Sequence, residues 1–498
     1  MSHFRQGNME AAQANFEAMV GRDPGCGPAR FRLSMVHSRR GRHLAAIESA
    51  RLALLDDPQR IELITHLARC HLMAGQPELA RVLATRALAL PRDNPVVLDS
   101  LAVLMTRLDE PSLAMELFDQ AIALDSRQAS MYFNRALAQR QFGMIEGAES
   151  DLEACIARNS GHAKAHSALA HLRTQDLIGN HVSRLRQAVE SAPSATPESE
   201  LLTLALFKEL DDLGDIDGAR LALTQAIASR RQRNGAGGSA REGLVEAVAE
   251  QCDESFCRPR TASSIGPTPL FVFGMRRSGV ALLGKLLSRH SRVRHLGQQQ
   301  PFSRLLSQQL GRDSVQPFTA QDISACSGID FEELGRRYLS EVSAAGDRPL
   351  LICESQPMNF QLAGLIARAL PRARMLHVVR DPLDNCLSLL AHADGDAGLP
   401  VHDPGALAAS YLDYHRLMQH WQQVLPGRMI DVSYESLVEK PEMVLRVVCS
   451  FLGIRYGSAL RMGLQLHQHS VGRGRRYAPV LPALESGLAP LHRQSRRA

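Results

Sequence analysis

Two arginines inside a glycine-bounded segment are the first residues of this chain whose spacing indicates anion chemistry. In PLFVFGMRRSGVALLGKLLSRH, residues 269–290, an apolar run meets Gly274, Gly279 follows after four residues, and a helical pattern begins. Backbone N–H groups between such glycines, at a helix N-terminus, can cradle a phosphate. Arg276 and Arg277 lie in this loop, and guanidinium groups match phosphate oxygens. The alternative is a tight turn with two solvated arginines.

The segment is P-loop-like in outline but lacks two groups of the nucleoside triphosphatase loop. Val280 and Ala281 stand where that loop carries Lys and Ser or Thr, the side chains that reach the phosphates and Mg²⁺. This composition argues against a P-loop kinase.

A second anion-binding element is indicated in VVRDPLDNCLSLL, residues 378–390. Arg380 ends a strand pattern, and Ser388, eight residues later, is expected at the start of the next helix. An arginine at a strand end and a hydroxyl at a helix start can hold another phosphate. The alternative is that Arg380 pairs with Asp381 or Asp384.

Strand and helix patterns alternate from Pro269 onward, which predicts a parallel sheet covered by helices. Ligands of such sheets bind beyond the carboxyl ends of the strands, so the turns there are candidate sites. The expected strands are 270–273, 350–354, 375–379 and 429–434, and clear helical patterns span 364–370 and 407–425.

The N-terminal part repeats every 34 residues, which predicts pairs of antiparallel helices. One column carries the turn residue, Gly or Asp, for which a left-handed backbone conformation costs little; a column five residues later carries the small side chain where two helices approach closely. The pattern resembles the tetratricopeptide repeat, and a further unit contains Gly214 and Ala219. The two columns are Gly7, Gly41, Gly75, Asp109 and Gly143, and Ala12, Ala46, Ala80, Ala114 and Ala148.

These patterns predict an α + α/β chain in three parts. A helical solenoid of tetratricopeptide repeats spans residues 1–232, a linker with the Gly-rich stretch RNGAGGSAREG spans 233–268, and the α/β domain spans 269–498. The concave surface of such a solenoid typically binds a peptide or protein segment. The alternative is that the repeats only support the second domain.

Composition excludes several classes of function. The net charge of +5 suits an anionic ligand but not nucleic acid, since no basic run is interleaved with aromatic residues. No apolar stretch is long enough to cross a membrane, and the N-terminus has no signal-peptide pattern, so a cytoplasmic location is expected. The nine cysteines show no Cys-x-x-Cys pair, and the His- and Asp-containing stretch 392–403 has no regular ligand spacing, so no metal site is expected.

Together the motifs resemble the PAPS-dependent sulfotransferases, in the branch that carries tetratricopeptide repeats and is related to protein-tyrosine sulfotransferases. GMRRSGVA, residues 274–281, resembles the family's 5′-phosphosulfate loop, G-x-P-R-S-G-T-T. Arg380, Asp381, Pro382 and Ser388 match its 3′-phosphate element. YESLVEKPE…FLG, residues 434–453, and SVGRGRRY, residues 470–477, match its following segments.

The resemblance implies that the chain binds PAPS and transfers its sulfuryl group to a hydroxyl acceptor, such as a protein tyrosine. Arg277, Ser278 and Gly279 would hold the 5′ phosphosulfate, and Arg380 and Ser388 the 3′ phosphate. The full set of implied nucleotide-binding residues is Gly274, Arg276, Arg277, Ser278, Gly279, Val280, Ala281, Arg380, Ser388, Tyr434, Ser470 and Gly472.

Several positions depart from the family pattern where catalysis takes place. Arg276 replaces the loop proline, and Val280 and Ala281 replace two hydroxyl residues. Gln298 stands where an acidic residue is expected, and Ser355 stands where the family has Lys. An amide such as Gln298 cannot take the acceptor's proton.

Histidines offer a substitute for the missing acid. His290 and His295 lie near Gln298 in the sequence, and a histidine can act as a base near neutral pH. The alternative is that both are surface residues. We therefore keep His295 and Gln298 as the candidate catalytic positions.

Three functional hypotheses follow from this balance. The first is an active PAPS-dependent sulfotransferase. The second is a catalytically impaired PAPS- or PAP-binding pseudoenzyme that acts as a repeat-based interaction scaffold. The third is a pure repeat scaffold whose second domain is silent.

Overall fold

The computed structural model describes residues 8–91, 93–234, 243–258, 266–297, 299–312, 318–343, 350–392, 398–460 and 470–495. The chain forms two compact units. Unit one comprises Met1–Pro193, Leu201–Gly214 and Gly311–Val315, and unit two comprises Ser194–Glu200, Asp215–Leu310 and Gln316–Ala498.

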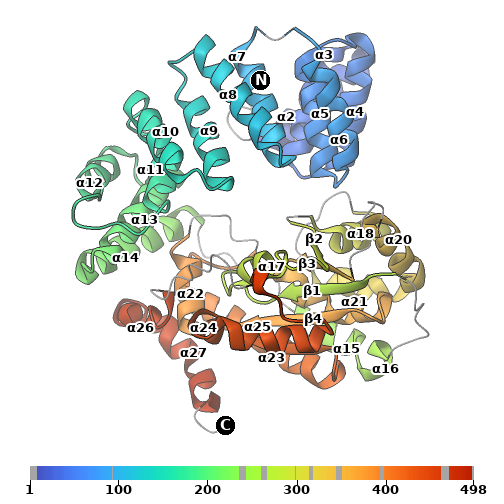
Figure 1. Cartoon of the computed structure of the whole chain (residues 1–498), viewed down its shortest axis with the longest axis vertical. Coiled ribbons are helices and arrows are strands. Elements are labelled where there is room, and N and C mark those ends of the chain that lie inside the picture. Colours follow the sequence, from blue (N-terminus) through green and yellow to red (C-terminus); the bar gives the residue numbers. More distant parts are fainter. Residues whose placement is uncertain are drawn as a thin grey trace. The chain divides into compact units, whose positions relative to one another are not determined.

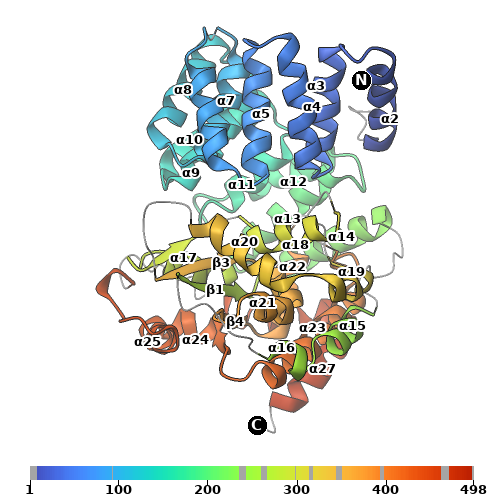
Figure 2. The ribbon, with the colours of Figure 1, turned by 90° about the vertical axis from the view of Figure 1, so that its right-hand side faces the viewer.

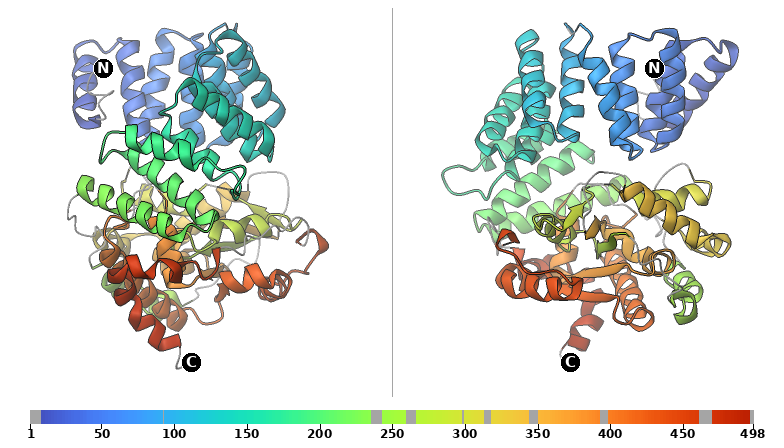
Figure 3. Two further views of the ribbon diagram at one scale, coloured as in Figure 1. Left: turned by 90° about the vertical axis from the view of Figure 1, so that its left-hand side faces the viewer. Right: turned by 45° about the vertical axis from the view of Figure 1, so that its right-hand side comes forward.

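Unit one is built from antiparallel helix pairs that stand side by side, as Figure 2 and Figure 3 show for the first helices of the chain. The first helices of neighbouring pairs contact each other, α5 with α7 and α7 with α9. Its helices are α2 (Met9–Arg22), α3 (Gly27–Arg39), α4 (His43–Asp56), α5 (Ile61–Met73), α6 (Pro77–Leu88), α7 (Pro95–Arg107), α8 (Pro111–Leu124), α9 (Ala129–Gln141), α10 (Ile145–Arg158), α11 (Ala163–Ala170) and α12 (Val182–Ser191). Helix α13 (Pro197–Asp212) begins in unit two and continues in unit one.

The turn column predicted from the 34-residue period takes the left-handed backbone conformation. The φ angles are 74° at Gly41, 77° at Gly75, 62° at Asp109, 79° at Gly143 and 75° at Gly214. Glycine adopts this conformation without steric cost, and aspartate tolerates it better than most residues. The column therefore ends the first helix of each pair and reverses the chain, as predicted.

The alanine column is buried at every described position, with exposures of 0–2%. A methyl group at these positions lets the two helices of a pair approach closely, and larger side chains from the same helices complete the core. Phe118 and Leu98, both 0% exposed, belong to one hydrophobic cluster of this unit. Close packing of small residues explains why the repeat is visible in the sequence, and it confirms the predicted helical solenoid.

A buried polar contact joins the repeats that contain Gly41 and Gly75. The Ser34 hydroxyl of α3 donates to the carbonyl of Ala46 in α4 (2.6 Å) and lies 2.8 Å from Nε2 of His66 in α5. Arg69 Nη2 donates to His66 Nδ1 (2.9 Å), so Nε2 carries the proton and donates to Ser34. Burial and the nearby Arg69 charge lower the pKa of His66 to about 3, which keeps the ring neutral.

Unit two contains a five-stranded parallel sheet in the order β2-β3-β1-β4-β5, part of which is visible in Figure 1. All four predicted strands form, and the short β2 is an addition that the sequence did not reveal. The order places β1 at the centre, between β3 and β4, so the loop after β1 lies between the ends of two neighbours. The strands are β1 (Thr268–Phe273), β2 (Val293–His295), β3 (Leu351–Ser355), β4 (Arg374–Val379) and β5 (Met429–Ser433).

Helices cover both faces of the sheet, as predicted for a parallel sheet. The α-helices of unit two after α13 are α14 (Ile216–Asn234), α15 (Leu244–Gln251), α16 (Glu254–Cys257), α17 (Val280–Leu287), α18 (Pro301–Gln309), α19 (Ala320–Ala325), α20 (Phe331–Ser343), α21 (Ala363–Ala369), α22 (Pro382–Leu390), α23 (Pro404–Val424), α24 (Tyr434–Glu439), α25 (Pro441–Leu452), α26 (Gly474–Tyr477) and α27 (Pro482–Ser495). Short 3-10 turns are η1 (Cys326–Gly328), η2 (Pro357–Leu362), η3 (Ser458–Leu460) and η5 (Ala478–Val480).

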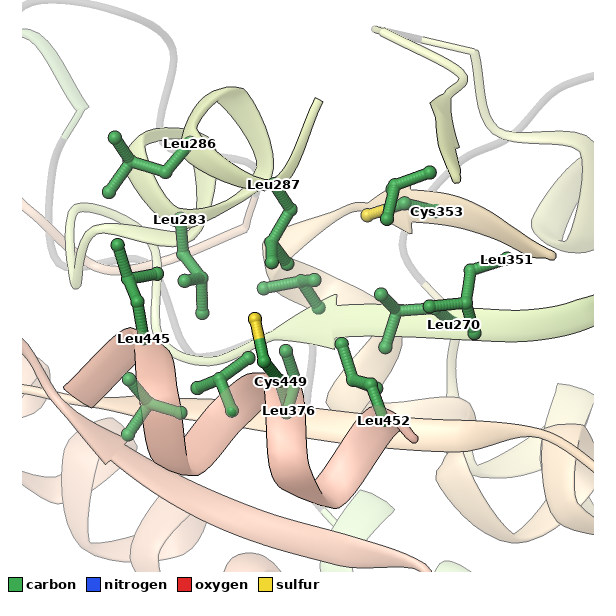
Figure 4. Packing of buried hydrophobic residues seen from close by; sticks show 14 of the residues in the cluster. Leu270, Leu283, Leu286, Leu287, Leu351, Cys353, Leu376, Leu445, Cys449 and Leu452 are labelled. Atoms are coloured by element: carbon green, nitrogen blue, oxygen red, sulfur yellow. The ribbon is translucent and has the colours of Figure 1, made fainter. Parts of the chain in front are cut away.

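Strand alternation divides the core of unit two between the two faces. Leu270 of β1 and Leu376 of β4 pack against α17 and α25, and Figure 4 shows this cluster with Leu283 and Leu445 from the two helices. The next residue of β1, Phe271, packs on the opposite face against the rings of Phe302 and Tyr338. Both faces are therefore closed, and ligand access is left to the strand ends.

Part of the stretch 233–268, predicted as a linker, is helical. Helices α15 and α16 form within it, and α15 packs on α19 and α23. The carbonyl of Cys252 accepts from His420 Nε2 (2.9 Å), and Cys252 lies against Gly364, where an added Cβ would approach to 2.7 Å. Among the helices that the structure describes, none is long and apolar enough to cross a membrane.

The buried His66 predicts a pH-dependent stability of the repeat unit. In the unfolded chain its pKa is near 6.5, so the unfolded state binds a proton that the folded state refuses until about pH 3. Stability is fully present above pH 6.5 and falls by roughly 1.4 kcal/mol for each pH unit below it. Denaturant unfolding of the full chain and of the His66→Gln variant at pH 7 and pH 4.5 measures this effect.

His66→Gln removes the titrating group and is expected to be destabilising at pH 7. The stability gap between wild type and variant should narrow at pH 4.5. A gap that stays constant between the two pH values would contradict the assignment of a neutral, buried ring.

Candidate functional site

The carboxyl ends of the parallel strands bring the predicted anion-binding residues to one edge of the sheet. The loop 274–279 follows β1, Arg380 follows β4, and Tyr434 follows β5 as the first residue of α24. Because β1 and β4 are hydrogen-bonded neighbours, their loops are adjacent. We use the name anion site for the loop 274–279 together with Arg380 and Ser388.

Glycines shape the loop after β1 by close approach of the backbone. A Cβ on Gly274 would lie 2.5 Å from the Val378 carbonyl oxygen, and one on Gly279 would lie 2.6 Å from Cδ2 of Tyr434. Gly279 is the N-cap of α17 with a φ of 110°, and Arg277 also has a positive φ, 69°. A non-glycine residue in this conformation is uncommon, and such strain is typical of functional loops.

The first turn of α17 directs backbone N–H groups toward the loop. The Val280 side chain is 2% exposed and packs in the core, whereas Ala281 is exposed. Neither side chain can hydrogen-bond an anion, so these two positions offer only their N–H groups. The Ser278 hydroxyl, 2% exposed as a residue, is one of the buried polar atoms without a hydrogen-bond partner among the described residues.

Arg380 holds the second loop against the first. Its Nη1 donates to the Arg277 carbonyl (2.9 Å), its Nη2 donates to the Ser470 carbonyl (2.8 Å), and its guanidinium stacks 4.6 Å from the centroid of the Tyr434 ring. Its Nε, like Ser278 Oγ, is buried without a hydrogen-bond partner among the described residues. The Tyr434 hydroxyl lies 2.7 Å from Ser470 Oγ, which closes this group.

The carboxylates that sequence reasoning offered as partners of Arg380 accept their hydrogen bonds from backbone N–H groups, and the Arg380 charge still acts on Asp384. Asp381 caps α22 by accepting from the N–H groups of Leu383 and Asp384, both at 3.0 Å. Asp384 accepts from the N–H groups of Gly472 (2.6 Å) and Gly474 (2.5 Å). Burial raises the pKa of Asp384, and these two hydrogen bonds counteract the rise.

Ser388 corrects one prediction: it lies in the last turn of α22 and not at the start of the helix. Asp381 caps the helix and Pro382 begins it, so eight residues from Arg380 reach the far end of a nine-residue helix. The Ser388 hydroxyl nevertheless accepts from Arg277 Nε (3.2 Å). Ser388 thus reaches the anion site from the C-terminal turn of α22. The carbonyl of Arg276 also contacts this helix, since it accepts from Asn385 Nδ2 (3.0 Å).

His392 is a residue of this site that the sequence did not single out. Its Nε2 lies 2.7 Å from Arg277 Nη2, and its Nδ1 lies 3.1 Å from the Ser388 carbonyl. Since a carbonyl only accepts, Nδ1 carries the proton and Nε2 accepts from Arg277. The signal was its spacing, because His392 follows Ser388 by four residues, about one helical turn.

Helix α23 supports both loops from the opposite face of the sheet. The Tyr411 hydroxyl donates to the Arg380 carbonyl (3.1 Å). Three residues later, the buried Tyr414 lies 2.5 Å from His377 Nε2, and Nδ1 of that ring lies 2.8 Å from Asp431. Burial raises the pKa of Tyr414, and a hydrogen bond with the Met275 backbone, in the loop after β1, opposes the rise. Nothing in the sequence pattern marks these tyrosines as more than core residues.

The candidate catalytic histidine lies at the ends of β2 and β3. His295 Nε2 is 2.6 Å from the hydroxyl of Ser355, the residue that stands where the family has Lys. Both side chains lie close to Gly284 of α17. A Cβ added there would be 2.8 Å from His295 Nε2 and 2.8 Å from Ser355 Oγ. Burial lowers the pKa of His295, which favours the neutral ring. Gln298, the other candidate, lies outside the described residues.

Two other sequence expectations meet the structure only in part. Among the described residues, no group of three or more His, Cys, Asp or Glu side chains is placed to hold a metal ion. Residues 393–397 of the His- and Asp-containing stretch are outside the described ranges. His290, the second substitute base, contacts the Arg455 carbonyl (3.0 Å), away from the anion site residues.

The close approach at Gly274 predicts a cost for any side chain there. Gly274→Ala places a methyl group against the Val378 carbonyl, which is fixed in β4, so the loop or the strand must shift. We expect the free energy of unfolding to fall by about 1–3 kcal/mol, as for other overpacked sites. Thermal or denaturant unfolding of the full chain measures it.

The matched control is Gly328→Ala in η1, where an added Cβ meets no atom within 4 Å. That variant should change stability by no more than about 0.5 kcal/mol. Equal effects of the two substitutions would show that the loop after β1 tolerates a side chain.

Comparisons with known proteins agree with this geometry. The model of the sulfotransferase family matches residues 269–458, and a tetratricopeptide-repeat model matches residues 1–61. An uncharacterised protein of Aquifex aeolicus is 26% identical over 45% of this chain and 33% of its own length. A putative protein-tyrosine sulfotransferase of Caenorhabditis briggsae is 25% identical over 41% of this chain and 69% of its own length.

A third relative, protein-tyrosine sulfotransferase A of Caenorhabditis elegans, is 23% identical over 43% of this chain and 59% of its own length. The chain thus spans from a third to about two thirds of the length of these relatives. The repeat match lies in the helical unit one, and the sulfotransferase match lies mostly in unit two, which contains the sheet. In this chain a segment that matches tetratricopeptide repeats thus precedes a segment that matches the sulfotransferase family.

Proposed function

We propose that this chain binds PAPS and transfers its sulfuryl group to a hydroxyl acceptor, with the repeats binding the acceptor or a partner protein. The observation that carries the proposal is the convergence of two strand-end arginines on one site. Arg380 donates to the Arg277 carbonyl, and Arg277 in turn donates to Ser388. A nucleotide with phosphate groups at both its 5′ and 3′ positions needs two such cationic groups at one edge of the sheet.

The anion site also has polar atoms that a nucleotide with two phosphate groups would satisfy. Ser278 Oγ and Arg380 Nε are buried without partners among the described residues, and buried polar groups normally have one. The glycines at 274 and 279 keep the backbone close, and the first N–H groups of α17 add positive potential. In this proposal Arg277, Ser278 and Gly279 hold the 5′ phosphosulfate.

The remaining parts of the nucleotide have candidate partners as well. Arg380 and Ser388 hold the 3′ phosphate. The ring of Tyr434, Ser470 and the backbone of Gly472 line the nucleotide near the late segment 470–477, where Arg380 and Asp384 already contact the backbone. These assignments rest on matching motifs, and the contacts above support them.

The reaction would be an in-line displacement at sulfur. The acceptor oxygen forms a bond to sulfur while the bond from sulfur to the bridging oxygen of the 5′ phosphate breaks. The products are a sulfated acceptor and 3′,5′-adenosine bisphosphate, and the acceptor's proton passes to a base. Positive charge at the 5′ phosphate stabilises the leaving group, as in phosphoryl transfer.

His295 is the candidate base in this reaction. Burial lowers its pKa, which favours the neutral ring, and a neutral imidazole can take a proton. Its Nδ1 accepts from the Gly297 N–H (3.3 Å), so Nε2 holds the ring's proton toward Ser355, and Nδ1 must release that bond to take the acceptor's proton. The hydroxyl of Ser355, 2.6 Å away, orients the ring but carries no charge. Gln298 remains the second candidate position, as an amide in place of the expected acid.

The alternative is a PAPS- or PAP-binding pseudoenzyme that acts as a repeat-based scaffold. The buried Val280 side chain and the neutral Ser355 favour it, because both remove groups that would act on the transferred sulfuryl. In this alternative the residues around the 3′ phosphate would still bind the nucleotide, but the sulfuryl group would not be transferred. A cytoplasmic location, expected from the sequence, belongs to either version.

Nucleotide binding is tested by thermal unfolding with 3′,5′-adenosine bisphosphate. We expect a rise in the midpoint, since a ligand at 100 times its Kd stabilises the folded state by about 2.7 kcal/mol. Arg380→Ala should abolish most of this rise, because it removes both a phosphate-binding group and the contact to the loop after β1. Arg446→Ala is the matched control, as Arg446 stacks on Tyr456 at the same 4.6 Å centroid distance but belongs to α25.

A wild-type chain without any shift would reject the proposed nucleotide site. An equal loss of the shift in both variants would mean that Arg380 acts only on the general fold.

Turnover is tested by transfer of labelled sulfate from PAPS to peptides and small molecules with free hydroxyl groups. If His295 is the base, the rate should fall as the pH drops toward its lowered pKa, because the protonated ring cannot accept the acceptor's proton. His295→Ala should lower the rate about 10²–10⁴-fold and remove this acidic limb. Bisphosphate binding should persist in the variant.

Binding without transfer in wild type would decide for the pseudoenzyme. Transfer that is unchanged in His295→Ala would move the base elsewhere. Gln298→Glu then tests the second position, where a gain in rate would show that this residue faces the acceptor.

A further inference from the structure

A buried arginine of α14 reaches the end of α22, the helix that carries Ser388. Arg230 is 3% exposed, and its ion-pair partner Glu200 is also 3% exposed. Both residues belong to unit two, together with the sheet and the anion site. A buried pair of this kind is retained only where its hydrogen bonds are satisfied, so its partners show what it holds.

All five N–H donors of the Arg230 guanidinium have acceptors. Two are given to Glu200 Oε1, from Nε (2.8 Å) and Nη2 (2.5 Å). The other three are given to backbone carbonyls, from Nη1 to Leu390 (3.3 Å) and Val401 (3.1 Å), and from Nη2 to His392 (3.0 Å). No donor is left for a ligand, so this arginine acts through the backbone that it binds.

The carbonyls of Leu390 and His392 lie at the C-terminus of α22, where the helix ends. A cation there satisfies carbonyls that lack intrahelical donors and interacts favourably with the helix dipole. The same short segment presents two side chains to Arg277, the hydroxyl of Ser388 and Nε2 of His392. Arg230 therefore fixes the backbone from which both partners of Arg277 project.

Helix α14 also contacts α26, a short helix that is hydrogen-bonded to α22. Arg220 donates from Nε (3.0 Å) and Nη2 (2.7 Å) to the carbonyl of Arg476 in α26. The first residue of α26, Gly474, donates to Asp384 in α22. Arg220 and Arg230 thus attach α14 to α26 and to the end of α22.

Glu200 keeps the Arg230 guanidinium in its orientation. It also accepts from Arg233 Nη2, so one carboxylate is shared by two arginines of α14. The sharing leaves the Arg230 charge only partly neutralised, which favours its bonds to the carbonyls at the end of α22.

We propose that Arg230, oriented by Glu200, is a positioning residue of the anion site, and that α14 is a necessary part of that site. The proposal rests on the proposed nucleotide function. The sequence places α14 in a repeat unit, because Gly214 and Ala219 follow the 34-residue pattern. The start of α14 thus follows the turn of a repeat, and its C-terminal half supports the end of α22 through Arg230.

The test compares two arginines of unit two that each bind the carbonyls near a helix end, the buried Arg230 and the half-buried Arg428. Arg230→Met removes the brace of α22. Arg428→Met is the matched control, because Arg428 donates to the carbonyls of Ala367 (3.1 Å) and Leu370 (2.8 Å), at the end of α21. Both variants are expected to melt at a lower temperature, so stability alone does not distinguish them.

The deciding measurement is the ratio of the affinities for 3′,5′-adenosine bisphosphate and 5′-AMP, taken below the melting temperature of each full-length variant. We expect Arg230→Met to lower this ratio at least tenfold, since Ser388 contributes to the 3′ phosphate. Arg428→Met should keep the wild-type ratio. Arg230→Lys keeps the charge and part of the hydrogen bonds, and should restore most of the preference.

Hydrogen exchange of α22 provides a readout that needs no nucleotide. The amides of Ala391 and His392, which donate to the carbonyls of Leu387 and Leu389, should exchange faster in Arg230→Met and as in wild type in Arg428→Met. An unchanged affinity ratio with unchanged exchange in Arg230→Met would overturn the proposal. If wild type binds neither nucleotide, the proposed function fails. The hydrogen-exchange comparison alone then tests whether Arg230 stabilises the end of α22.

Discussion

The guanidinium of Arg380 is buried at the carboxyl edge of the sheet, where it joins three segments that are far apart in the sequence. It donates to the carbonyls of Arg277 and Ser470 and stacks on the ring of Tyr434. Removing such a group from water is costly unless its donors are satisfied, and two of its three nitrogens have protein acceptors. Its Nε is buried without a hydrogen-bond partner among the described residues, so this side chain both joins the loops and keeps one donor for the anion that we propose.

The parallel sheet makes this arrangement possible. Strands β1 and β4 pair in parallel, so their carboxyl ends meet, and the two loops that follow lie next to each other. One face of the sheet is closed by aliphatic packing with α17 and α25, and the other by aromatic rings and α23. From that second face Tyr411 and Tyr414 contact the backbone of both loops, so the core of the domain and its anion site share side chains.

The two parts of the site differ in their hydrogen bonds and charged groups. The part around Arg380, Ser388 and Asp384 is dense in hydrogen bonds and buried. The part around His295 and Ser355 holds one neutral pair beside Gly284, without the charged lysine of the family pattern. This contrast is the physical reason why nucleotide binding and turnover are separate questions for this chain.

The sequence alone determined the features that depend on local chemistry and on periodicity. The Gly and Asp turn column, the buried alanines, four strands and the places of the two loops with Arg277 and Arg380 follow from which conformations a residue allows and which faces it must bury. The resemblance of the two parts to known families was also readable from these motifs and from the 34-residue period, and the family models match the same parts of the chain.

Only the tertiary structure decided which distant side chains meet. Short β2 had too few residues for a pattern, and the start of α22 depended on a cap by Asp381, which moved Ser388 to the last turn. His392, Tyr411 and Arg230 look like ordinary helix or loop residues in the sequence. The roles of Tyr411 and Arg230 come from contacts across as many as 171 positions, which are set by the packing of whole elements and leave no local signal, and His392 had only its spacing from Ser388 to mark it.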